Sequence, residues 1–99
     1  MHYLLYYDLA PDYLARRGQF RDAHLHLACQ AQQRGELVLA GALSDPADMA
    51  VLMFEADSPE LVHAFASADP YVTQGLVTGY RVRQWNTVVG EAAFAPVKI

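Results

Sequence analysis

Hydrophobic residues along the chain form short apolar runs that alternate with segments of helical spacing. Four apolar runs bounded by turn residues are typical of β-strands, and they occupy residues 2–10, 36–43, 49–57 and 76–89. Two segments with apolar residues at helical spacing are predicted to be helices, at about 19–34 and 57–69. Residues 13–19 are expected to form a connection broken at Gly18, and 69–75 a turn that holds a short helical piece.

The ends of both predicted helices carry suitable residues. Gly35 directly follows the first helix, and glycine readily adopts the left-handed conformation that commonly ends a helix. Asp57 or Ser58 can cap the second helix, and Pro59 fits its first turn.

The order strand, helix, strand, strand, helix, strand predicts a ferredoxin-like βαββαβ fold of the α+β class. One antiparallel four-stranded sheet then carries both helices on one face, within a single domain that spans residues 1–99. The first strand has apolar side chains on both faces, Leu4 and Tyr6 on one, and Tyr3, Leu5 and Tyr7 on the other. Because such a strand is covered on both sides, the helix-free face needs a partner. A second copy of the chain is the simplest partner, so we expect a homodimer through the open sheet face.

The amino-acid composition supports the expected homodimer and argues against nucleic-acid and membrane partners. Hydrophobic residues make up 54% of the 99 residues, and so short a chain buries only about two-thirds of its unfolded surface. The formal net charge of −4 argues against a nucleic-acid partner, because such proteins normally carry a clustered basic face. No stretch approaches the roughly 20 apolar residues that span a bilayer, and the N-terminus lacks a secretion signal. We therefore expect a cytoplasmic protein with no membrane partner.

Cofactor signals are weak. The single cysteine, Cys29, excludes an intramolecular disulfide and a cysteine-cluster metal site, and we expect it to be buried as a small apolar residue. The sequence has no glycine-rich phosphate loop and no cluster of metal ligands, so we expect neither a nucleotide or flavin cofactor nor a metal.

Helical phase separates two histidines of the first predicted helix. His24 falls in the middle of the apolar arc, whereas His26 points to the opposite side and is expected in solvent. Two readings of His24 remain open. It is either a core histidine with its nitrogens satisfied, or a general base or acid that lines a cavity between helix and sheet.

An imidazole in acid–base chemistry usually needs a partner, commonly a carboxylate. Asp69, in the segment "SADPYV" (67–72), is the candidate, since Pro70 forces the chain to turn there. Turn chemistry or capping of the following helical piece is the alternative role of Asp69.

Three segments in this order resemble the signatures of the YCII-related (YciI-like) family: "RDAHL" (21–25), "GELVLAGAL" (35–43) and "ADPY" (68–71). The resemblance implies a ferredoxin-like protomer that dimerises as the dimeric α+β barrels do, and an active site centred on a histidine–aspartate pair. Matched by motif, that pair is His24 and Asp69. One departure stands out: the family typically has Gly-Pro at the end of the second strand, whereas here Gly41 is followed by Ala42. The pocket rim and the substrate therefore remain open.

Four further residues are candidates for binding a substrate. Arg21 lies one turn before His24 and either forms a surface ion pair or holds a substrate carboxylate or phenolate. Tyr71 brings a hydroxyl group near Asp69, Tyr6 is a candidate for the pocket wall, and Gly41 for its rim.

The resulting hypothesis is an enzyme that performs acid–base chemistry on a small cyclic or aromatic organic acid, of the lyase, isomerase or dehalogenase type. The main alternative is a non-catalytic module that only binds a small molecule, because one fold supports many roles. A third possibility is metal-assisted catalysis through His24 and Asp69.

Overall fold

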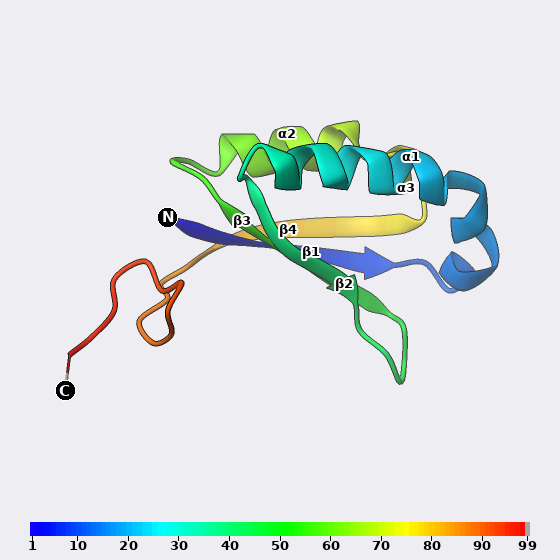
Figure 1. The fold of residues 1–99 in the computed structure, drawn as a ribbon. Coiled ribbons are helices and arrows are strands. Elements are labelled where there is room, and N and C mark those ends of the chain that lie inside the picture. Colours follow the sequence, from blue (N-terminus) through cyan, green and yellow to red (C-terminus); the bar gives the residue numbers. More distant parts are fainter. Residues whose placement is uncertain (99) are drawn as a thin grey trace.

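Four strands form one antiparallel sheet in the spatial order β2-β3-β1-β4 (Figure 1). The computed structural model describes residues 1–98. Along the chain the elements are β1 (His2–Leu9), α1 (Tyr13–Gln33), β2 (Leu37–Ala42), β3 (Met49–Glu55), α2 (Glu60–Ala68), α3 (Pro70–Thr73) and β4 (Val77–Trp85). The predicted α+β ferredoxin-like order is therefore confirmed. No helix within residues 1–98 is long and apolar enough to cross a membrane.

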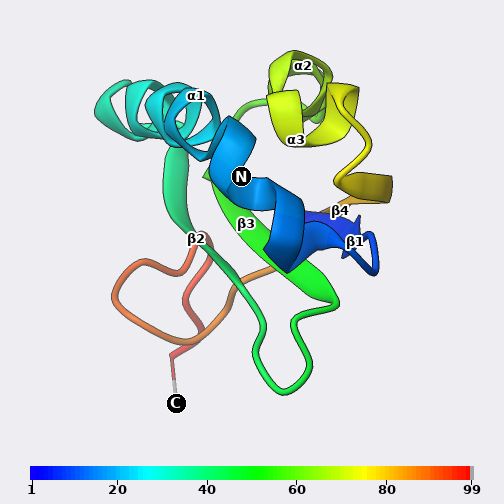
Figure 2. The ribbon, with the colours of Figure 1, turned by 90° about the vertical axis from the view of Figure 1, so that its right-hand side faces the viewer.

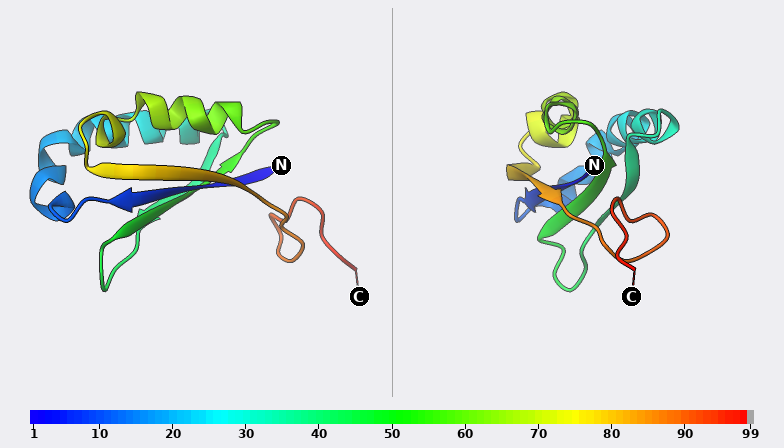
Figure 3. Two further views of the ribbon diagram at one scale, coloured as in Figure 1. Left: turned by 180° about the vertical axis from the view of Figure 1, so that it is seen from behind. Right: turned by 90° about the vertical axis from the view of Figure 1, so that its left-hand side faces the viewer.

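All three helices lie on one face of the sheet, and Figure 2 shows α1 and α2 side by side on it. In the described part of the chain the other face carries no helix, and residues 86–98 leave the end of β4 on that side (Figure 3). Strand alternation follows the prediction, since Tyr3, Leu5 and Tyr7 are 4%, 0% and 1% exposed beneath the helices. The core therefore sits between the sheet and the helices.

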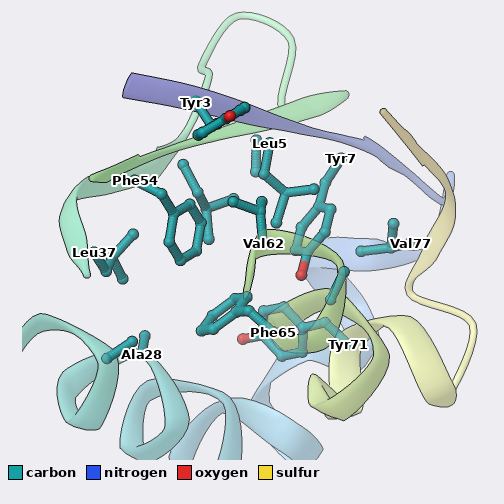
Figure 4. Close-up of a cluster of buried hydrophobic side chains, with 14 of the residues drawn as sticks. Tyr3, Leu5, Tyr7, Ala28, Leu37, Phe54, Val62, Phe65, Tyr71 and Val77 are labelled. Carbon is teal, nitrogen blue, oxygen red and sulfur yellow. The ribbon is translucent and has the colours of Figure 1, made fainter. Parts of the chain in front are cut away.

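The centre of this core is aromatic and aliphatic. Figure 4 shows Phe54 of β3 beside Val62 and Phe65 of α2, with Tyr7 and Tyr71 next to them. The rings of Phe54 and Phe65 meet edge to face at 5.1 Å, a favoured geometry for aromatic pairs. This packing fixes α2, and with it α3, relative to β1.

The first helix is longer than predicted. α1 begins at Tyr13, so the expected connection over 13–19 is wrong, and Gly18 lies inside the helix. Glycine costs about 1 kcal/mol in a helix, but burial of the Tyr13 side chain to 5% exposure anchors this first part of α1. Tertiary packing has overridden the local signal.

Two smaller predictions are also corrected. α2 begins at Glu60, and neither Asp57 nor Ser58 supplies a side-chain cap. Cys29 is exposed rather than buried. The reason is that only Tyr13, Ala28 and Ala31 of α1 are buried, so the strip of α1 that faces the core is narrow.

Gly35 ends α1 as predicted, with φ at 78°. Its N–H donates to the carbonyl of Gln32, and the N–H of Glu36 donates to that of Ala31, which is the Schellman arrangement.

Alanine at the two glycines of this region should have opposite effects. Gly35→Ala is expected to lower the free energy of unfolding by about 1–2 kcal/mol, because a Cβ disfavours the left-handed conformation. Gly18→Ala is expected to raise it by about 0.5–1 kcal/mol, because Gly18 is exposed inside the helix and nothing lies within 4 Å of an added Cβ. Guanidinium unfolding measures both, and shifts of the same sign would contradict these assignments.

Candidate active site

His24 and Asp69 are 45 residues apart in the sequence, and the fold brings them together. Nδ1 of His24 lies 2.8 Å from Oδ1 of Asp69. α1 carries His24, whereas Asp69 joins α2 to α3 with an extended backbone, as the following Pro70 requires. Oδ1 of Asp69 also accepts a hydrogen bond from the Tyr71 N–H and so caps α3. The capping role and the contact with His24 therefore occur together.

The carboxylate of Asp69 is completely buried and has three donors around it. Besides His24 and the Tyr71 N–H, the hydroxyl of Tyr7 donates to Oδ2 over 2.8 Å. An ionised carboxylate only accepts hydrogen bonds, and the Tyr7 hydroxyl and the Tyr71 N–H both donate to Asp69, which suits an ionised side chain. A hydrogen bond donated by Nδ1 to Asp69 leaves Nε2 of a neutral imidazole as an acceptor.

Tyr7 is the member of this cluster that the sequence did not identify. Burial, and then the Asp69 carboxylate, raise the pKa of Tyr7 well above its usual range. The hydroxyl therefore keeps its proton and serves as a fixed donor. The predicted pocket residue Tyr6 is its neighbour in β1, but it points to the opposite face of the sheet, where the Arg81 guanidinium lies 5.7 Å from its ring. Tyr6 is therefore not brought together with the other predicted site residues at the cavity beside His24.

Tyr71 contributes its ring and its hydroxyl to different contacts. The ring stacks on the imidazole of His24, with centroids 3.8 Å apart and planes 6° from parallel. The ring of Tyr13 meets that of Tyr71 edge to face, with centroids 5.8 Å apart. The Tyr71 hydroxyl is buried and has no hydrogen-bond partner within residues 1–98. Burial, and then Tyr13, raise the pKa of Tyr71, although Arg21 and Arg17 act in the other direction.

A cavity of about 220 Å³ opens beside this cluster. Its polar lining consists of Tyr7, Tyr13, Arg17, Arg21, His24 and Tyr71. The rest of the lining is aliphatic or glycine and includes Gly41 at the β2 side. The side chain of His24 is 15% exposed, and that of Asp69 behind it is 0% exposed. Four predicted site residues, Arg21, His24, Gly41 and Tyr71, thus line one cavity.

Comparison with known proteins places the chain in a family. The sequence profile of the YCII-related domain matches residues 1–86. The chain belongs to the YCII-related family. No curated protein sequence matches the chain.

Several solved structures share this fold and align with most of this YCII-related chain. The 5-chloro-2-hydroxyhydroquinone dehydrochlorinase TftG of Burkholderia phenoliruptrix, in complex with 2,5-dihydroxybenzoquinone, is 24% identical, with a TM-score of 0.74 over 88% of this chain and 95% of its own. A NIPSNAP family protein of Agrobacterium tumefaciens is 13% identical, with a TM-score of 0.58 over 98% of this chain and 97% of its own. A NIPSNAP domain protein of Burkholderia xenovorans is 15% identical, with a TM-score of 0.52 over 97% of this chain and 98% of its own. At these identities the likeness shows a shared fold.

The end of β2, where Ala42 replaces the proline that is typical of the family, lies at the cavity. Ala42 still pairs with Ala50 of β3, so β2 continues to this residue. Ala40, Gly41 and Ala42 together line the cavity. Small residues therefore form its wall at the end of β2.

A larger cavity, of about 480 Å³, lies at His2, Met53, Trp85 and the segment that follows β4. Both ring nitrogens of His2 are engaged, Nδ1 with the Thr87 hydroxyl at 2.6 Å and Nε2 with Glu55 at 2.7 Å. The hydroxyl of Thr87 also accepts the N–H of Phe94. This histidine fastens the C-terminal segment to the sheet, so the smaller cavity beside His24 is the better candidate for chemistry.

Proposed function

We propose that this YCII-related protein is a small-molecule enzyme in which a His24–Asp69 dyad performs acid–base chemistry. The observation that carries the proposal is the buried Asp69 carboxylate, which lies 2.8 Å from Nδ1 of His24, a histidine that lines a cavity. The substrate is a small cyclic or aromatic organic acid, and the reaction is of the lyase, isomerase or dehalogenase type.

The dyad works through the two nitrogens of one ring. Nδ1–H of His24 donates to Asp69, which fixes the tautomer and leaves Nε2 free to take a proton from the substrate. The imidazolium that forms is stabilised by the Asp69 carboxylate, and it returns the proton in a later step. Tyr7 and the Tyr71 N–H hold the carboxylate in place during this exchange.

The size of the cavity limits the substrate. At about 220 Å³ it is smaller than the roughly 300–1,000 Å³ of sites for drug-sized ligands, so it suits a single substituted ring. The name of TftG gives a substituted six-membered ring as its substrate, and its complex contains a benzoquinone. Because TftG shares the fold, this supports a ring substrate here.

A screen of the wild-type protein separates catalysis from simple binding. Small cyclic and aromatic organic acids are incubated with the protein in D₂O, and NMR and mass spectrometry follow deuterium uptake and product formation. Catalysed exchange or turnover of a ring acid is the expected result. Acids that bind in the cavity and stay unchanged across the panel would instead favour the non-catalytic binding module.

We also propose a homodimer through the open sheet face. The register between strands places Leu4, Tyr6, Leu39, Val51, Met53 and Trp85 on that face. Leu39 is 73% exposed in the protomer. The same register places Arg81 and Arg83 of β4 on this face, so its apolar part lies mainly over β1, β2 and β3. Monomeric proteins rarely expose large apolar patches, so this part of the face suits a second copy.

Leu39→Glu is expected to weaken the dimer at least tenfold, because it loses about 1.5–3 kcal/mol of apolar burial and adds a charge to the interface. Sedimentation equilibrium measures the dissociation constant. Leu14→Glu is the matched control, since Leu14 is 59% exposed on α1, away from the open face. A monomeric wild type, or equal effects of the two variants, would contradict this interface.

A further inference from the structure

Two guanidinium groups line the cavity without a carboxylate partner. Arg17 and Arg21 are one turn apart on α1, with His24 on the following turn. The ion pairs of Arg16, Arg34 and Arg81 lie elsewhere, and within residues 1–98 no carboxylate is in ion-pair distance of Arg17 or Arg21. Like charges on adjacent helical turns repel one another, so an anion between them would be stabilising.

Among the described residues 1–98, the cavity is lined by no acidic side chain, although the chain has a net charge of −4. Asp69 lies behind His24, and both of its oxygens already accept hydrogen bonds. A cationic ligand would therefore meet two positive charges and no free carboxylate. The cavity is locally positive within an acidic protein.

The hydroxyl of Tyr71 adds an independent observation. The residue is only 3% exposed, and its hydroxyl has no hydrogen-bond partner within residues 1–98. A buried polar group without a partner costs about 1–3 kcal/mol, so such groups are normally satisfied. Because Tyr71 lines the cavity, a ligand oxygen can supply the missing acceptor.

We propose that the cavity contains an oxyanion-binding site, formed by Arg17, Arg21 and the Tyr71 hydroxyl, that binds an aromatic acid as its anion. The ligand group is a carboxylate or a phenolate, since both present acceptor oxygens to these donors. The aliphatic wall around Gly41 takes the ring, and the volume of about 220 Å³ admits one ring. The site deepens the proposed function, and it rests on that function for its link to catalysis.

Binding of simple probes tests the site by isothermal titration calorimetry. Benzoate is compared with benzamide, its neutral isostere, and 4-nitrophenolate at mildly alkaline pH distinguishes a phenolate from a carboxylate ligand. We expect wild type to bind at least one of the two anions at least tenfold more tightly than benzamide, and the preference to weaken as salt is added.

Variants assign the preference to individual donors. Tyr71→Phe keeps the ring that stacks on His24 and removes only the hydroxyl, and it should weaken binding of the preferred anion about tenfold or more. Arg17→Gln should weaken binding of the same anion to a similar extent. Because Arg17 is not a buried core residue, this variant tests the site without a substitution in the core. Arg34→Gln is the matched control, because it removes the same charge from the end of α1 outside the cavity. We expect it to change the affinity less than twofold.

Equal binding of benzamide and both anions would overturn the site, and so would equal effects of Arg17→Gln and Arg34→Gln. These outcomes are separable from failure of the proposed function. If the anion binds with the expected dependence on Arg17 but no acid is turned over, the oxyanion site stands and the enzyme proposal fails. If turnover is found without a preference for anions, only the oxyanion site fails.

Discussion

His24→Gln is expected to lower the turnover number about 10²–10⁴-fold, the range that a positioned general acid or base typically contributes. The glutamine amide can still donate to Asp69 and fills a similar volume, but it cannot accept and release a proton. The measurement is turnover of whichever ring acid the D₂O screen identifies, with affinity for the preferred anion determined in parallel. Loss of turnover with retained binding would assign the effect to proton transfer.

His26→Gln is the matched control for this experiment. His26 lies two residues further along α1, is exposed, and is not part of the cavity lining. Its replacement should leave turnover within about twofold of wild type. Wild-type turnover in His24→Gln, or equal losses in the two variants, would exclude His24 as the acid–base group.

The structure agrees with those predictions that follow from backbone geometry, namely strand alternation, helical phase and the restriction that proline places on the residue before it. Period-two alternation assigned Tyr3, Leu5 and Tyr7 to one face of β1, and all three are buried together. Helical phase placed His24 toward the sheet, and Pro70 restricts Asp69 to an extended backbone. These local constraints, together with the family motifs, were enough to predict a contact across 45 residues.

The missed residues depended on packing that no local pattern contains. Alternation divides β1 into two apolar faces, but it does not indicate which face meets the cavity, so it does not distinguish Tyr7 from Tyr6 as the cavity residue. The prediction omits Tyr13 and Arg17 because Gly18, taken as a local signal alone, indicates a break before the helix. Once burial of Tyr13 extends α1 toward its N-terminus, Arg17 falls one turn from Arg21 and enters the same cavity. Arg17 therefore joins Arg21 at the cavity because α1 begins at Tyr13.

Asp69→Ala is expected to lower the free energy of unfolding by about 3–5 kcal/mol, the cost of removing one partner from a buried charged cluster. Tyr7, His24 and the Tyr71 N–H would all lose their hydrogen-bond acceptor at once. Guanidinium unfolding at pH 7 and a fixed protein concentration measures the loss, since dimerisation would otherwise shift the apparent stability.

Tyr7→Phe completes a double-mutant cycle with this variant. Alone, it should cost about 1–3 kcal/mol, because Oδ2 of the buried Asp69 loses its donor. In the Asp69→Ala background it should cost close to nothing, since phenylalanine removes a hydroxyl that has already lost its partner. The two substitutions are therefore expected to be non-additive by about 1–3 kcal/mol. Additive costs, or a loss below about 1 kcal/mol for Asp69→Ala alone, would contradict a buried charged carboxylate held by Tyr7. Either result would mean that the Tyr7–Asp69 hydrogen bond does not stabilise the fold, and that it does not position His24 for proton transfer.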